Sequence, residues 1–176
     1  MGFDHPSELQ VYYSMPSHRD IRIESASLRF IPVETRVPLK FGSETLTSVT
    51  CARASVTVAN ASGIEATGWG ETPLSVQWVW PSSISYSERH EDLKDFTSRL
   101  CPKLSAISAY GHALGLGHEF LFNRLPKILA DFNAGLRLGQ EPMPWLAALV
   151  CASAFDVALH DAYGRINDVP IYSAYG

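Results

Sequence analysis

Cysteine and basic blocks are scarce in this chain of 176 residues. Its three cysteines are an odd number, lie far apart and form no C-x-x-C pair (Cys51, Cys101 and Cys151). This usage favours reduced, partly buried thiols in a cytosolic protein. The 14 basic and 18 acidic residues give a net charge of -4, and the basic residues form no cluster. The charge pattern therefore argues against nucleic acid or an anionic membrane as a partner.

Long hydrophobic runs are also missing. The longest apolar run, from Trp145 to Phe155, is interrupted by Ser153 and soon followed by Asp156. It is too short to span a bilayer, and we expect a buried helix instead. The first ten residues have no basic region followed by an apolar run, which argues against a signal peptide. We therefore expect a cytoplasmic protein.

The remaining composition is that of a globular domain. Hydrophobic residues make up 46% and charged residues 18% of the chain, whose length suits one ordinary domain. After an irregular arm at 1–21, segments 23–33, 49–59 and 64–71 have the alternation of half-buried strands. The sequence Asn60-Ala-Ser-Gly63 predicts a turn between the second and the third. The pattern therefore predicts a three-stranded antiparallel meander.

The second half has helical patterns. We expect helices at 88–100, with Ser87 as N-cap and Pro102 as a stop, and at 118–133, with a kink at Pro126. The segment GHALGLG is expected to form a loop or a broken helical turn. A long helix is predicted at 145–163, closed by Gly164. Strands followed by helices indicate an α+β fold, with a helical bundle against one face of a small sheet.

No self-contained catalytic or metal-binding group can be identified from the residues. His112 and His118, next to Glu119, lie six residues apart, which is not the spacing of a helical metal site. Asp156 and Asp161 would lie about 140° apart on a helix and cannot form a close pair. We therefore predict no catalytic residue, metal site or cofactor in this chain. A small unrelated enzyme with a histidine site remains an alternative.

Two segments favour ligand recognition. VPLKFGSETLTS lies between the first two strands, and GWGETPLSVQWVWP includes the end of the third strand and the residues after it. Both place aromatic residues beside glycines and hydroxyl groups, which is typical of a mobile lid, although ordinary connecting loops have the same composition.

Three stretches together resemble the amino-terminal domain of the mandelate racemase and muconate-lactonizing enzyme group of the enolase superfamily. They are IESASLRFIPVETRVPLKFG, ARASVTVANASGIEATGWGE and ASAFDVALHDAYGRINDVPIYSAYG. The third stretch matches the family pattern most fully. Trp69-Gly70-Glu71 is similar to the glycine-glutamate sequence with which the third strand ends in that family. His160 stands where the family often has tryptophan, and segment 105–119 is longer than usual. The matching positions in the third stretch are Asp156, Ala158, Leu159, Asp161, Gly164, Pro170 and Gly176.

The resemblance implies a capping domain at 22–165 and a linker at 166–176 that leads to a (β/α) barrel beyond Gly176. In such enzymes the barrel carries the bases and the acidic ligands of Mg²⁺, and removes a proton next to a carboxylate. The cap closes the barrel and selects a small carboxylate substrate. The contacts that the resemblance implies fall in the two segments above (Lys40, Phe41, Gly42, Ser43, Trp69, Glu71, Trp78 and Trp80).

The chain by itself is therefore expected to be inactive, with the barrel domain and a second copy of the chain as partners. The full enzyme would be a racemase, a cycloisomerase or a sugar-acid dehydratase. A stand-alone binding domain derived from such a cap is the alternative.

Overall fold

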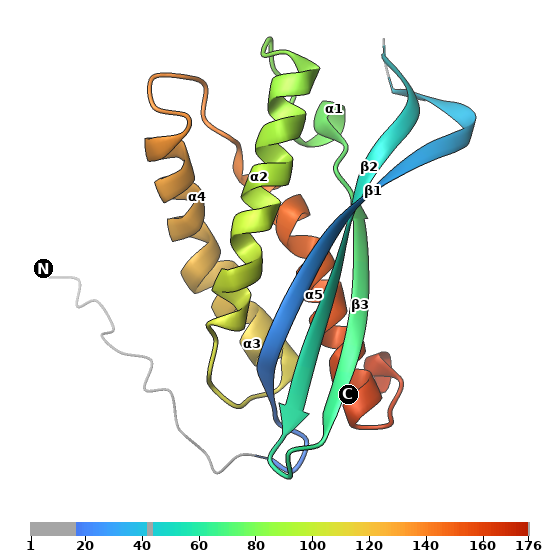
Figure 1. Cartoon of the computed structure of the whole chain (residues 1–176), viewed down its shortest axis with the longest axis vertical. Coiled ribbons are helices and arrows are strands. Elements are labelled where there is room, and N and C mark those ends of the chain that lie inside the picture. The colour runs from blue at the N-terminus through green and yellow to red at the C-terminus, as the bar shows by residue number, and fades with distance from the viewer. Residues whose placement is uncertain (1–16, 42–43, 176) are drawn as a thin grey trace, which may run out of the picture.

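The structure, a computed structural model, describes residues 17–41 and 44–175. Three strands form an antiparallel sheet in the order β1-β2-β3 (Figure 1). They are β1 (Ile21–Phe41), β2 (Glu44–Asn60) and β3 (Glu65–Pro73). In the turn between β2 and β3, Asn60 Oδ1 accepts hydrogen bonds from the backbone N–H groups of Ser62 and Ile64, and Gly63 takes a φ of +78°. The predicted meander is confirmed.

The first two strands are longer than predicted. Most of the expected loop VPLKFGSETLTS is paired, with Leu39 opposite Leu46 and Lys40 opposite Thr45, after an irregularity that begins at Glu34. We call the described part of residues 34–48 the hairpin extension. It projects past β3, which ends at Pro73. Cross-strand pairing gives this segment a place for its backbone hydrogen bonds, which an open loop would leave to water.

The helical elements lie on one face of the sheet. Helix α5 packs against β3 and β2, α2 packs against β1 and α5, and α4 lies on the side of α2 away from the sheet (Figure 1). Within the described residues there is no barrel, and the α+β fold predicted from the sequence is confirmed. The elements are α1 (Val76–Val79), α2 (Tyr86–Ser105), α3 (Ala113–His118), the π-helical η1 (Glu119–Arg124), α4 (Leu125–Gly135), α5 (Trp145–Ile166) and the 3₁₀ turn η2 (Ile171–Ala174).

Helix α2 begins and ends differently from the prediction. Its N-cap is Ser85, whose Oγ accepts the N–H of Glu88, and not Ser87. Pro102 lies inside the last turn and does not stop the helix, which continues to Ser105. A proline there removes a single donor near the helix end, which the packing of Leu100 and Leu104 in the core outweighs.

Two glycine predictions also need correction. Part of the GHALGLG segment forms α3, which begins after His112, whose Nδ1 accepts the N–H of Leu114. Gly164 lies within α5 and does not close it. Its missing side chain lets the chain return closely, because a Cβ there would lie 3.0 Å from the carbonyl oxygen of Val169. The helix ends instead at Ile166 with Asn167 as its C-cap, and Asp168 takes the positive φ of 51°.

The helix predicted at 118–133 is continuous, and its geometry changes before Pro126. The π-helical turns of η1 end at Arg124, and Pro126 occupies the start of α4. A wider turn before a proline avoids the clash of its ring with the carbonyl four residues earlier.

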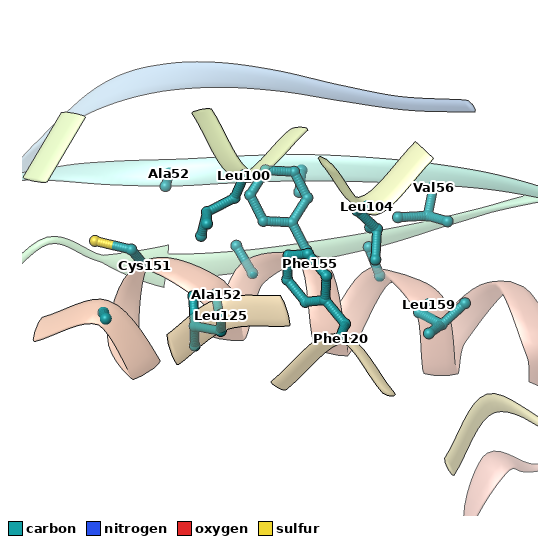
Figure 2. Packing of buried hydrophobic residues seen from close by; sticks show 14 of the residues in the cluster. Ala52, Val56, Leu100, Leu104, Phe120, Leu125, Cys151, Ala152, Phe155 and Leu159 are labelled. Atoms are coloured by element: carbon teal, nitrogen blue, oxygen red, sulfur yellow. The ribbon is translucent and has the colours of Figure 1, made fainter. Parts of the chain in front are cut away.

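The core lies between the sheet and the helices. Figure 2 shows Phe155 of α5 between Leu100 and Leu104 of α2 and Phe120 of η1. On the sheet side, Gly68 and Gly70 face α5. A Cβ on Gly68 would lie 2.1 Å from the backbone nitrogen of Ala162, and one on Gly70 would lie 2.1 Å from the carbonyl oxygen of Ala154. The glycines of β3 therefore allow helix and strand backbones to touch.

Helix α5 is long and apolar enough to cross a membrane, and it is the one such helix among the described residues. Half of its apolar window is buried inside the domain, against β2, β3 and α2. Core helices of soluble proteins have the same length and composition, and the burial of α5 agrees with the buried helix predicted from the sequence.

Residues at both proposed domain limits belong to the folded domain. Of the predicted arm 1–21, the structure describes residues 17–21, and Ile21 already belongs to β1. In the predicted linker 166–176, Ile171 and Ala174 pack against the core. The linker is thus attached to the domain as far as residue 175.

Candidate functional site

The two segments singled out in the sequence emerge at one end of the sheet. The backbone N–H of Leu74 donates to the carbonyl of Thr50, so the chain leaves β3 beside the root of the hairpin extension. Helix α1 comes directly after, and Figure 1 shows it next to that root. The hairpin extension and α1 therefore lie side by side at one end of the sheet, which we call the lid end.

The side chains predicted to bind substrate point in different directions. Lys40 is exposed on the hairpin extension, and Trp78 is exposed on α1. Trp69 and Glu71 lie on the sheet face opposite α5, because their neighbours Gly68 and Gly70 face that helix. Gly42, Ser43 and the side chain of Phe41 lie outside the described part of the structure. Lys40 and Trp78 are therefore the two described candidates that are exposed at the lid end.

Glu71 is held by a neighbour in the sheet. Arg53 Nε and Nη2 donate to Glu71 Oε2 at 3.1 and 2.9 Å, across the β2–β3 pair. Both side chains are more than a third exposed. The pair therefore contributes little stability and leaves the carboxylate free to exchange partners.

Trp80 belongs to the core. Its side chain is 1% exposed, and its Nε1 donates to Glu141 Oε1 at 2.9 Å. The guanidinium of Arg137 lies over its ring, 5.3 Å from the centroid. Burial removes Trp80 from direct contact with a ligand in this structure, and its role here is to anchor the chain after α1.

The residues around Trp80 form a polar network, centred on the buried Arg137, that sequence reasoning missed. Arg137, 3% exposed, donates to Glu88 Oε1 at 2.7 Å and to Asp92 Oδ2 at 2.8 Å. Burial raises the pKa of Asp92, and the charge of Arg137 opposes that rise. Hydrogen bonds from Ser82 and Trp80 lower the pKa of Glu141. The spacing of these residues in the sequence does not reveal the network, because Arg137 lies 49 residues from Glu88 and 45 from Asp92.

A second cluster of polar and aromatic side chains connects α3, α5 and Tyr175. Tyr175 Oη and His160 Nδ1 share a short hydrogen bond, and the ring of His112 packs on Tyr163 with centroids 4.4 Å apart. His160 Nε2 lies 3.7 Å from Asp156 Oδ1, too far for a hydrogen bond. Burial lowers the pKa of His160 and raises that of Asp156. This group fastens residue 175 to α5.

The predicted separation of Asp156 from Asp161 is found in the structure. Asp161 Oδ2 accepts the backbone N–H of Trp69 at 2.9 Å and Arg165 Nε at 2.8 Å, whereas Asp156 faces His160. The two carboxylates thus contact different groups, and they do not form an acid–base pair.

The histidines at 112 and 118 are not brought together as metal ligands. His112 caps α3, and His118 stacks on Phe122. Across residues 17–41 and 44–175, no three His, Cys, Asp or Glu side chains form a group that could hold a metal ion. The described residues thus do not fit the Mg²⁺ of the resembled enzymes, which favours six oxygen ligands.

The fold has counterparts among solved structures, although no family model and no curated protein matches the chain. A dipeptide epimerase from Enterococcus faecalis V583, complexed with Mg and the dipeptide L-Leu-L-Tyr, matches with a TM-score of 0.50 and 15% identity. The match covers 88% of this chain and 34% of the epimerase. The chain has the fold of one part of that enzyme.

Two further matches have lower TM-scores. A mandelate racemase/muconate lactonizing enzyme-like protein from Rubrobacter xylanophilus has a TM-score of 0.42 and 20% identity, over 87% of this chain and 33% of that one. L-talarate/galactarate dehydratase from Salmonella typhimurium LT2 has a TM-score of 0.46 and 17% identity, over 89% and 33%. The chain thus spans about a third of the structures it matches. The resemblance drawn from the sequence is confirmed at the level of the fold.

Proposed function

We propose that this chain is the amino-terminal capping domain of an enolase-superfamily enzyme, and that it closes a barrel domain and selects a small carboxylate substrate. The observation that carries the proposal is the match of 88% of the chain to one third of a dipeptide epimerase. The lid end supports it, because the hairpin extension and α1 project together from one end of the sheet. The three free cysteines agree with a cytoplasmic location.

We assign substrate contact to this chain and the chemical step to the partner barrel. Lys40 would attract the substrate carboxylate, and Trp78 would cover the bound substrate and exclude water. The partner barrel would hold Mg²⁺, which stabilises the negative charge formed when a proton next to a carboxylate is removed. Whether the reaction is a racemisation, a cycloisomerisation or a sugar-acid dehydration depends on the groups of that barrel.

The coding sequence after codon 176 provides the first test. An in-frame barrel with a K-x-K motif and spaced acidic residues supports the proposal, whereas a stop codon favours a stand-alone binding domain derived from such a cap. In the longer protein, Lys40→Gln and Trp78→Ala should raise KM for the substrate while the affinity for Mg²⁺ stays unchanged. Unchanged KM in both variants would refute the substrate-selecting role.

The chain of 176 residues by itself should show no turnover. A library of acid sugars and amino-acid derivatives with Mg²⁺ is the screen. Turnover that a substitution within this chain abolishes would instead identify a self-contained enzyme, for which His112 and His118 are the first residues to replace.

A further inference from the structure

A groove lies between α2 and the η1–α4 segment, on the side of the helical layer away from the sheet. Its volume is about 530 Å³, within the range of small-molecule sites in proteins. It is separate from the lid end and from the polar groups described above. Its lining includes Arg99 and Lys103 of α2, Arg124 of η1, and Lys127 and Asp131 of α4.

Positive charge is concentrated in this groove. Four cations and one carboxylate line it, in a chain whose net charge is -4. Two of the four lysines of the chain, Lys103 and Lys127, are here. Within the described residues neither of them has an ion-pair partner, whereas Lys94, on another part of α2, pairs with Glu91. Two ammonium groups are thus available to a ligand.

The arginines also keep donors free. Arg99 uses Nε and Nη2 on one oxygen of Asp95, and Arg124 contacts Glu119 through Nε at 3.3 Å. Both ion pairs are partly exposed and are therefore weak. Each guanidinium retains at least one N–H group that an incoming carboxylate or phosphate can engage.

The cations come from two facing helical rows. Arg99 and Lys103 are four residues apart on α2, and Arg124 and Lys127 lie three apart on the opposite side. The partly buried Ile128 supplies an apolar surface, while Phe132 is buried beneath it with the Arg99 guanidinium 5.6 Å from its ring centroid. The groove therefore has charged groups on two walls and carbon atoms between them, which suits a molecule with anionic groups on an organic skeleton.

The geometry points to a binding site for a small organic polyanion, one that carries two or more carboxylate or phosphate groups. Its anionic groups contact Lys103 and Lys127 with help from Arg99 and Arg124, and its skeleton lies over Ile128. This inference does not depend on the proposed capping function, because the groove uses none of the residues of the lid end.

Isothermal titration at low salt tests the site, with citrate as the carboxylate probe, pyrophosphate as the phosphate probe and acetate as the monoanion control. We expect saturable binding of citrate or pyrophosphate, no saturable binding of acetate, and weakening by added salt. The probe that binds more tightly identifies the carboxylate or phosphate class. Amide NMR shifts upon titration of the unaltered chain should cluster on residues 99–103 and 123–132.

The double variant K103Q/K127Q should lose at least about tenfold in affinity, a change of about 1.4 kcal/mol. K94Q is the control, which removes one positive charge from α2 outside the groove, and should bind as the unaltered chain does. Both lysines of the double variant are exposed, and circular dichroism checks its fold. No saturable binding of either probe, an equal loss in K94Q, or NMR shifts outside the groove would each overturn the site.

Discussion

The backbone N–H of Trp69 donates to Asp161 Oδ2 at 2.9 Å, across 92 residues of sequence. Trp69 lies on β3, an edge strand of the sheet, and Asp161 lies on α5. An edge strand exposes unpaired N–H groups that invite another strand to add. The carboxylate of Asp161 accepts a hydrogen bond from one of these groups and connects α5 to β3. The two sequence motifs that contain Trp69 and Asp161 are therefore in direct contact.

Removal of that acceptor should weaken the contact between β3 and α5. Asp161→Ala is expected to lower the free energy of unfolding by about 1 kcal/mol, the usual net value of a hydrogen bond. Asp161→Asn keeps an acceptor oxygen and should recover most of the loss, although it loses the charge that faces Arg165. Urea unfolding of both variants is the measurement. Equal losses in the two variants would show that charge, and not the hydrogen bond, is what matters.

The glycines of β3 should tolerate no side chain. Gly70→Ala places a Cβ 2.1 Å from the carbonyl oxygen of Ala154, so helix and strand must separate. We expect a loss of at least about 3 kcal/mol, as for severe overpacking of a core. Gly115→Ala is the control, because nothing lies within 4 Å of its Cβ and α3 gains a better helix former. A Gly70→Ala protein as stable as the control would contradict the close packing.

The sequence predicted the parts of the fold that depend on local periodicity. Alternation in 49–59 marked β2, and the apolar run after Trp145 marked α5. It failed where tertiary contacts decide: Gly164 looked like a helix end, yet it is buried inside α5 because the returning chain needs the space. Trp80 looked like a ligand contact, and only the distant Glu141 and Arg137 explain its burial.

Acid should destabilise the attachment of the chain end. Burial lowers the pKa of His160 below its ordinary value of 6.5, so the unfolded state binds the proton more readily. The neutral ring therefore contributes stability above pH 6.5 that is lost as pH falls through the lowered pKa. Burial raises the pKa of Asp156, so protonation of that carboxyl acts in the opposite direction and favours the folded state as pH falls. The charge of His112 adds to the lowering of the His160 pKa.

The test compares the unaltered chain with His160→Gln from about pH 7.5 to 5.5. The stability of the variant should fall less over this pH range than that of the unaltered chain. Part of the fall should persist in the variant, because burial also lowers the pKa of His90. NMR titration of the His160 ring should give a midpoint below 6.5. A midpoint above that value would show that the charge of Asp156 outweighs burial.

Thiol reactivity should separate the cysteines. Burial raises the pKa of Cys151 to about 12, and its side chain is fully enclosed. Cys51 and Cys101 are half-buried, and burial raises the pKa of both. With an aromatic disulfide reagent at neutral pH, we expect slow reaction at Cys51 and Cys101 and none at Cys151 until urea unfolds the domain. Rapid labelling of Cys151 would reveal frequent opening of the core.

The exposed apolar residues at the lid end should drive self-association of the chain when it is alone. Val37 and Leu39 on the hairpin extension and Trp78 on α1 are each at least half exposed. Burying about 400 Å² of such surface offers about 10 kcal/mol before the costs of association. We therefore expect a dimer or a larger assembly at low micromolar concentration.

Sedimentation velocity provides the measurement, with a triple variant in which serine replaces Val37, Leu39 and Trp78. The triple variant should sediment as a monomer. A control with serine at Leu114 and Phe122, which are equally exposed on α3 and η1, should associate as the unaltered chain does. An unaltered chain that sediments as a single monomeric species would contradict the prediction and favour the stand-alone binding domain. If the control substitutions dissociate the assembly, the contact surface lies on α3 and η1, where Leu114 and Phe122 are exposed, and not at the lid end.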